Sequence, residues 1–357
     1  MALTAAALLA VGLAGGTAPP TASAERTAVV YAYLADNTVV RTDERFGVWR
    51  VARVAPKAAV QGGAGHSLAF SADGRTLWAL SVTGQRLVAL SPATLAPRKR
   101  VTFAPTEVPR ALAVGRRSGR LYVAYTVERP VPKRRDQPKD ARLRILDPSG
   151  TRTLADTLVR PAGRRSGWVW ALVIDDQERR AYMSYHGSDT SGLDTLTING
   201  PRVTRCRRPG YIVCWGQPHG TLAVVGDRIY TATGAPWIGE YAPDGTLQRR
   251  LETGLENVHL MEFAVNPAQD KIYATASCLL GAGFASVDIA SGEPTTWESK
   301  ACGDSIAATN TLAVVGSTRM VDADPDLRGK LLVVDPANGE VTRQHVTPSE
   351  AVDILTR

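Results

Sequence analysis

The sequence of 357 residues lacks the motifs that identify the common enzyme classes. It contains no G-x-S-x-G nucleophile elbow, no phosphate-binding P-loop and no H-E-x-x-H zinc motif. Aromatic residues make up only 6% of the chain, and no run of them alternates with arginine as a nucleic-acid platform would require. We therefore expect no nucleic-acid partner, and no reaction can be assigned from a motif.

Charged residues are absent from the first 24 positions. Residues 4–14 form an apolar run, and small residues then lead to Ala22-Ser23-Ala24, which is typical of a secretory signal peptide and its cleavage site. The run is shorter than the ~20 residues that span a bilayer, and no later segment is long enough. We expect a signal peptide over residues 1–24, a secreted mature chain over 25–357, and no membrane span. Because the usual basic residues before the run are missing, a disordered small-residue tail is the alternative.

Lysine is scarce: seven lysines accompany 35 arginines, and the formal net charge is +8. Codon bias in a GC-rich genome explains an arginine excess of this kind. A partner with negative charge, such as a surface polymer or a phospholipid, is the functional alternative.

Long amphipathic helices are also missing, because the apolar residues occur in runs of four to seven separated by turn residues. This pattern is typical of an all-β protein with many short strands. The runs recur as one unit whose inner strands begin about 40 to 60 residues apart, which is the spacing of a four-stranded propeller blade. Six copies occupy residues 67–102, 111–160, 170–206, 221–252, 262–298 and 305–346.

Two incomplete pieces remain at the ends of the mature chain. Residues 27–33, 37–43 and 47–54 read as three strands without an inner one, and residues 351–357 read as an inner strand without the other three. Together they make one further blade, and closing a ring in this way removes open sheet edges. The sequence therefore predicts a seven-bladed β-propeller closed by its C-terminal strand.

The repeated unit resembles the YVTN-type repeat of exported, YncE-like propellers. Its second strand carries Leu121-Tyr122-Val123, with relatives at 229–231 and 272–274, and its third strand ends in turns such as Asp147-Pro148-Ser149-Gly150. The turns at 198–200 and 242–245 depart from this pattern. The resemblance covers nearly the whole mature chain and implies a propeller fold, but it implies little about activity, because propellers host many functions.

In such a propeller, the connections between strands two and three share one face with the connections from each blade to the next. The long insertions 127–140, 186–192, 278–283 and 317–329 all join strands two and three, and long loops on one face often carry function. The four cysteines fall on this face as well. An even number in an exported chain predicts disulfides, and their positions favour Cys206–Cys214 and Cys278–Cys302.

The residues before the inner strands are expected to crowd the mouth of the central channel on this face. They are the candidate ligand-binding residues His66, Arg110, Trp170, His219, His259, Glu262, Asp304 and Glu350. Neutral imidazoles near a shared axis can hold a transition metal, which makes the three histidines weak metal candidates. Histidine beside a carboxylate can also perform acid–base chemistry. A polar channel mouth that binds nothing specific is the third interpretation.

Two loops offer weaker candidates. Asp322, Asp324 and Asp326 resemble the start of a calcium loop, but no glutamate closes it, so an acidic solvated loop is the simpler interpretation. Residues 129–144 carry seven basic side chains among prolines, which suits either an exposed insertion or electrostatic capture of an anionic polymer.

Two functional hypotheses follow. The first is a monomeric binding or interaction module that uses the loop face around the channel, with a small ligand, a protein or an anionic polymer as its partner. The second is an enzyme, either a lyase, a hydrolase or an oxidoreductase, that uses the histidines and carboxylates of the channel mouth. No cofactor is assigned.

Overall fold

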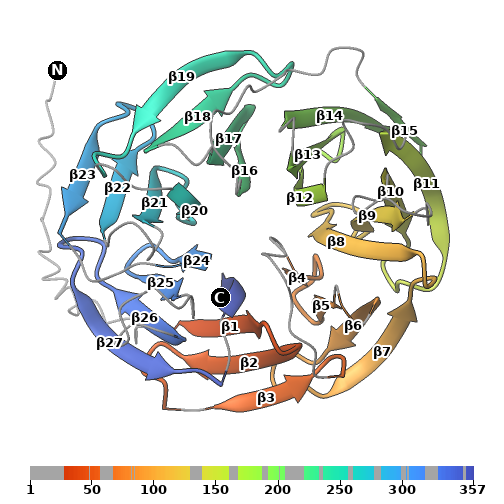
Figure 1. Cartoon of the computed structure of the whole chain (residues 1–357), viewed down its shortest axis with the longest axis horizontal. Helices are drawn as coiled ribbons and strands as arrows, with labels where there is room; N and C mark the ends of the chain where they lie inside the picture. The colour runs from red at the N-terminus through yellow and green to blue at the C-terminus, as the bar shows by residue number, and fades with distance from the viewer. Residues whose placement is uncertain are drawn as a thin grey trace, which may run out of the picture.

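A computed structural model of the chain shows seven antiparallel sheets of four strands arranged around a central axis (Figure 1). The predicted seven-bladed β-propeller is thereby confirmed. The described residues are 28–47, 49–56, 67–81, 83, 85–128, 139–160, 168–186, 192–200, 202–205, 221–232, 236–255, 260–276, 283–298, 303, 305–317, 329–348 and 351–357. Within these ranges every regular element is a strand, and no helix suited to crossing a membrane is found.

We name the sheets A to G in ring order, and the strands of each sheet run from the inner one to the outer one. Sheet A contains β28 (Ala351–Thr356), β1 (Val29–Leu34), β2 (Thr38–Asp43) and β3 (Arg50–Arg53). Sheet B contains β4 (Leu68–Phe70), β5 (Leu77–Ser81), β6 (Arg86–Leu90) and β7 (Pro97–Thr102). Sheet C contains β8 (Glu107–Val114), β9 (Leu121–Glu128), β10 (Lys139–Leu146) and β11 (Thr153–Arg160). Sheet D contains β12 (Trp168–Ile174), β13 (Arg180–His186), β14 (Gly192–Asn199) and β15 (Arg202–Arg205).

The remaining three sheets follow the same order. Sheet E contains β16 (Leu222–Val225), β17 (Arg228–Ala232), β18 (Trp237–Tyr241) and β19 (Leu247–Glu252). Sheet F contains β20 (Leu260–Val265), β21 (Lys271–Ala276), β22 (Phe284–Asp288) and β23 (Pro294–Trp297). Sheet G contains β24 (Ser305–Ala308), β25 (Ala313–Gly316), β26 (Lys330–Val334) and β27 (Val341–Val346).

The second and third strands of each sheet are buried on both of their faces. Successive side chains of a strand point to opposite faces, so each sheet sends alternate residues to its two neighbours. In β1, for example, Val30 and Ala32 pack toward sheet G, whereas Tyr31 and Tyr33 pack toward sheet B. This double burial explains why the sequence shows continuous apolar runs rather than alternation of apolar and polar residues.

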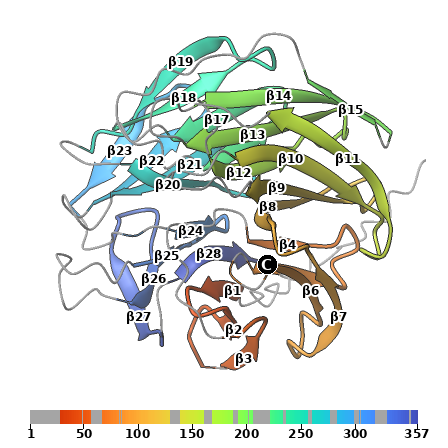
Figure 2. The ribbon, with the colours of Figure 1, turned by 45° about the vertical axis from the view of Figure 1, so that its right-hand side comes forward.

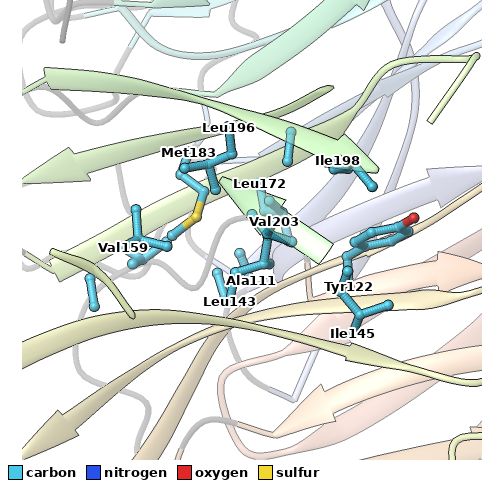
Figure 3. Packing of buried hydrophobic residues seen from close by; sticks show 14 of the residues in the cluster. Ala111, Tyr122, Leu143, Ile145, Val159, Leu172, Met183, Leu196, Ile198 and Val203 are labelled. Carbon is cyan, nitrogen blue, oxygen red and sulfur yellow. The ribbon is translucent and has the colours of Figure 1, made fainter. Parts of the chain in front are cut away.

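The hydrophobic core is therefore divided among the interfaces between sheets. Each of seven clusters of buried residues joins a different pair of neighbours, from A–B around to G–A. The C–D cluster is shown in Figure 3, where Tyr122 and Leu143 of sheet C lie near Leu172 and Met183 of sheet D. Each sheet is thus held by two neighbours, which requires the ring to close.

Closure is made by β28, which pairs antiparallel with β1 at the inner side of the ring (Figure 2). The register places Val30 opposite Thr356 and Ala32 opposite Ile354. Just after the end of β28, Arg357 exchanges two backbone hydrogen bonds with Val29, each 2.9 Å long. The predicted seventh blade, with an inner strand from one end of the chain and three strands from the other, is confirmed.

Ile354 offers a test of closure, because it is 3% exposed and packs in the cluster between sheets G and A. We expect Ile354→Ala to lower the free energy of unfolding by about 2–5 kcal/mol, through lost burial and the cavity left behind. Urea denaturation followed by circular dichroism measures this loss. Val346→Ala is the control, because that valine is 64% exposed and its loss is expected to cost less than about 0.5 kcal/mol. Equal effects of the two substitutions would contradict the role of Ile354.

Candidate functional site

The propeller presents two faces with different connections. One face, which we call the loop face, carries the connections between strands two and three and those between consecutive sheets. The long insertions identified in the sequence do join strands two and three, namely β9–β10, β13–β14, β21–β22 and β25–β26. The opposite face, which we call the turn face, carries the short turns between strands one and two and between strands three and four.

Three of the eight predicted channel-mouth residues are described: Arg110, Trp170 and Glu262. The others, which lie outside the described residues, are His66, His219, His259, Asp304 and Glu350. The four cysteines, the acidic segment 322–326, the signal segment 1–24 and most of the basic insertion also lie outside them, so what the sequence suggests for these parts stays a prediction. Among the described residues, no three histidine, cysteine or carboxylate side chains are grouped to hold a metal ion.

Arg110 and Trp170 share one structural position, a β-bulge near the start of an inner strand. The β8–β9 ladder passes from Pro109 to Ala111, and the β12–β13 ladder passes from Val169 to Ala171. The same irregularity occurs in β20 and β28. A bulge redirects side chains and is common beside functional sites. Trp170 itself is half-buried and packs against the apolar cluster between sheets D and E.

The residue after the bulge differs among these four inner strands. It is alanine in β8 and β12, but it is Glu262 in β20 and Asp353 in β28. Sheet G lies between sheets F and A, and its inner strand β24 begins with the buried Ser305. The structure therefore puts two carboxylates at equivalent places, two sheets apart in the ring.

Asp353 was not a candidate from the sequence, which pointed instead to Glu350 in the same segment. Its Oδ2 accepts a hydrogen bond of 2.6 Å from the backbone N–H of Leu68, the first residue of β4 in sheet B. Although part of the residue reaches the surface, its carboxyl group is enclosed. Removal of the carboxyl from water raises the pKa of Asp353 to about 7, and the backbone N–H donors offset only part of this rise. Asp353 thus links the closing strand to the next sheet.

One pocket among the described residues lies on the turn face and measures about 900 Å³. Drug-sized ligands occupy pockets of about 300–1,000 Å³. Its walls come from four neighbouring sheets. Sheet A contributes the ends of β28 and β1, Arg41 and Glu44; sheet B contributes Gly74, Arg75, Arg98 and the turn at 91–93; sheet G contributes 309–311; and sheet F contributes Pro267. We call this site the arginine pocket.

Four arginines line this pocket, together with one acidic side chain. They are Arg41, Arg75, Arg98 and Arg357, and the acidic residue is Glu44. Four positive side chains against one negative leave a net side-chain charge of +3 on the lining. A concave site with charge of one sign raises the local concentration of ligands of the opposite sign.

The turn between β4 and β5 organises the basic side of the pocket. Gly74 has a φ of +67°, a conformation that suits glycine, and a side chain there would collide with the Arg357 guanidinium 2.7 Å away. Arg357 Nη1 donates a 2.8 Å hydrogen bond to the Gly74 carbonyl, and Arg98 Nη1 donates one of 2.8 Å to the Arg75 carbonyl. Two guanidinium groups are therefore held at consecutive carbonyls of one turn.

Comparisons with known proteins support the fold and leave the family open. The chain matches no protein-family model and no curated protein by sequence. Its structure is similar to that of AztD from Citrobacter koseri, with a TM-score of 0.59, 14% identity, and coverage of 93% of this chain and 98% of AztD. It is also similar to a protein of unknown function from Desulfotomaculum acetoxidans, with a TM-score of 0.63, 10% identity, and coverage of 91% and 96%. Hydrazine synthase from Kuenenia stuttgartiensis is a third neighbour, with a TM-score of 0.56, 14% identity and 78% of each chain covered. At these identities the likeness shows the propeller fold alone.

The raised pKa of Asp353 predicts a specific pH dependence of stability. The unfolded carboxyl titrates near 4 and the folded one near 7, so between these values the unfolded state ionises first and is favoured as pH rises. The contribution of Asp353 to the free energy of unfolding is fully present below about pH 4 and is lost by about pH 7. The change in the free energy of unfolding over this range is on the order of a few kcal/mol. We expect the melting temperature of Asp353→Asn, relative to wild type, to rise between pH 4 and pH 7.

Thermal denaturation of the two proteins across pH 4–8 makes the measurement. Glu107 and Asp156 have lowered pKa values, so their protonation destabilises the folded state at the acidic end of this range. This effect is the same in both proteins and cancels when their melting temperatures are subtracted. Parallel curves for wild type and Asp353→Asn would show that the aspartate ionises normally in the folded protein.

Proposed function

We propose that the chain is an exported binding module of YVTN-like architecture, and that its ligand site is the arginine pocket. The observation that carries the proposal is the pocket itself, which is of ligand size and is walled by four sheets on the face of short, closely held turns. Part of the lining, including Tyr31, Arg41 and Arg98, comes from strands, and sites built on strands are more precisely held than sites on loops.

The chemistry of the lining supports binding. Arginine stays protonated in proteins, so its guanidinium orients and neutralises a ligand rather than exchanging protons with it. Glu44, the acidic member, already uses Oε2 to accept a hydrogen bond of 3.1 Å from the backbone N–H of Ala28. The charged groups of this pocket are therefore suited to recognition.

Export is part of the proposal and is supported by the sequence alone. The uncharged first 24 residues and the even number of cysteines are the supporting features. The loop-face residues proposed as ligand-binding from the sequence stay a separate prediction, which this proposal does not require.

A blocked pocket tests the function. Ala93 is exposed, lines the pocket and lies in the turn between β6 and β7, so Ala93→Trp puts a large side chain into the pocket wall without disturbing a core. Ala337→Trp is the matched control, because Pro336-Ala337 occupies the equivalent turn of sheet G, outside the pocket lining. Thermal-shift screening of a library of polar metabolites is the measurement.

At a concentration of 100 times Kd, a ligand adds about 2.7 kcal/mol of stability, enough to raise the melting temperature by a few degrees. We expect at least one compound to stabilise wild type and Ala337→Trp but not Ala93→Trp. If every compound shifts the two variants equally, the pocket is not a ligand site.

A further inference from the structure

We propose that the arginine pocket binds a small multivalent oxyanion, a molecule with several phosphate or carboxylate groups, through Arg41, Arg98 and Arg357. The inference rests on the proposed function and names the class of ligand for the same site.

The positive charge of the pocket lining is only partly balanced. Among the described residues, no carboxylate forms an ion pair with Arg41, Arg75, Arg98 or Arg357, although ion pairs occur elsewhere, as between Arg144 and Glu107. Of the described residues that line the pocket, Glu44 alone is acidic, so the four arginines leave an excess of positive charge. An anion in the pocket balances that excess.

The nearby acidic groups are engaged by their own turns. Asp73 Oδ1 accepts hydrogen bonds from Ser71 Oγ at 2.6 Å and from the backbone N–H of Arg75 at 3.0 Å. Asp43 Oδ1 similarly accepts from the backbone of Arg45 and Gly47. Short-range bonds of this kind are the ordinary role of aspartate in turns. These carboxylates therefore shape the turns around the pocket, and the guanidinium groups keep donors for a ligand.

The donors of Arg98 and Arg357 are fixed in place. Each guanidinium carries five N–H donors, and the structure uses one nitrogen of each, Nη1, to hold it against the turn at Gly74 and Arg75. Arg357 also lies over the ring of Phe70, with its Cζ 5.4 Å from the ring centroid. A guanidinium restrained in this way loses less entropy on binding, and its remaining donors suit the paired oxygens of phosphate or carboxylate.

Arg41 adds a buried donor on the side of sheet A. Its Nε is enclosed and has no hydrogen-bond partner in the described part of the chain. A buried donor without an acceptor costs about 1–3 kcal/mol. Arg41 also lines the pocket, so an oxyanion there is attracted by the charge of its guanidinium, whereas the enclosed Nε is not itself reached. Because Arg41 comes from sheet A and Arg98 from sheet B, a ligand with more than one anionic group engages both sides.

Isothermal titration calorimetry with sodium tripolyphosphate and with sodium citrate tests the inference, with sodium acetate as the monovalent comparison. We expect one or both multivalent anions to bind more tightly than acetate, and their affinity to fall as sodium chloride is raised. Binding of tripolyphosphate alone assigns phosphate as the preferred group, and binding of citrate alone assigns carboxylate.

The variants locate the binding. Arg98→Gln and Arg357→Gln change exposed side chains and are each expected to weaken binding about tenfold or more, since each removes charge-assisted hydrogen bonds. Arg41→Gln is expected to weaken it as well, with its melting temperature measured to check folding. The control is Arg152→Gln, an exposed arginine in the turn between β10 and β11 and outside the pocket, with affinity unchanged within about twofold.

Two results would overturn the inference. One is that neither multivalent anion binds better than acetate. The other is that Arg98→Gln and Arg357→Gln bind as wild type does, or that Arg152→Gln is weakened equally, since binding would then follow net charge alone. A neutral or cationic compound could lose its binding in Ala93→Trp but bind Arg98→Gln and Arg357→Gln as it binds wild type. In that case the pocket is a ligand site, and the proposal that its ligand is an oxyanion is wrong. If Ala93→Trp and Ala337→Trp are alike for every compound, both proposals fail.

Discussion

Burial of both faces of every sheet is the constraint on which the structure depends. No single sheet has a core of its own, because its alternate side chains belong to clusters shared with two neighbours. A linear array of such sheets leaves two apolar faces open, whereas a ring leaves none. All seven interfaces between sheets therefore form only when sheet A closes the ring. Its strands β1 and β28 come from opposite ends of the described chain.

The same sheet also concentrates the unusual chemistry of the protein. On the side of the channel, Asp353 of β28 connects the closing strand to β4 through an enclosed carboxyl. On the turn face, the ends of β28 and β1 form the centre of the arginine pocket, and sheets B, F and G complete its walls. An enclosed carboxyl with a raised pKa and an excess of arginines over acidic groups are both costly in a folded protein, and such costs are concentrated at functional sites.

Most of the fold follows from the sequence, because short apolar runs bounded by turn residues mark each strand of a doubly buried sheet. The tally of six complete units and two complementary fragments predicts both the ring and its closure. The bulges of the inner strands could not be read in this way. Asp353 follows the bulge of β28 just as Glu262 follows the bulge of β20. The two positions are recognised as equivalent only when the strands are aligned on their bulges, which the sequence does not show.

The arginine pocket could not be found from the sequence for a different reason. Attention to long insertions favours the loop face, whereas Arg41, Arg75 and Arg98 lie in or beside short elements that look like ordinary turns and strands. They form no motif, because the ring alone brings them to Arg357. The pocket does not exist until β28 has paired with β1. A molecule in which β28 has not yet paired, or from which a protease has removed it, would lack the site altogether, so occupancy by a ligand would distinguish closed rings from open or clipped ones.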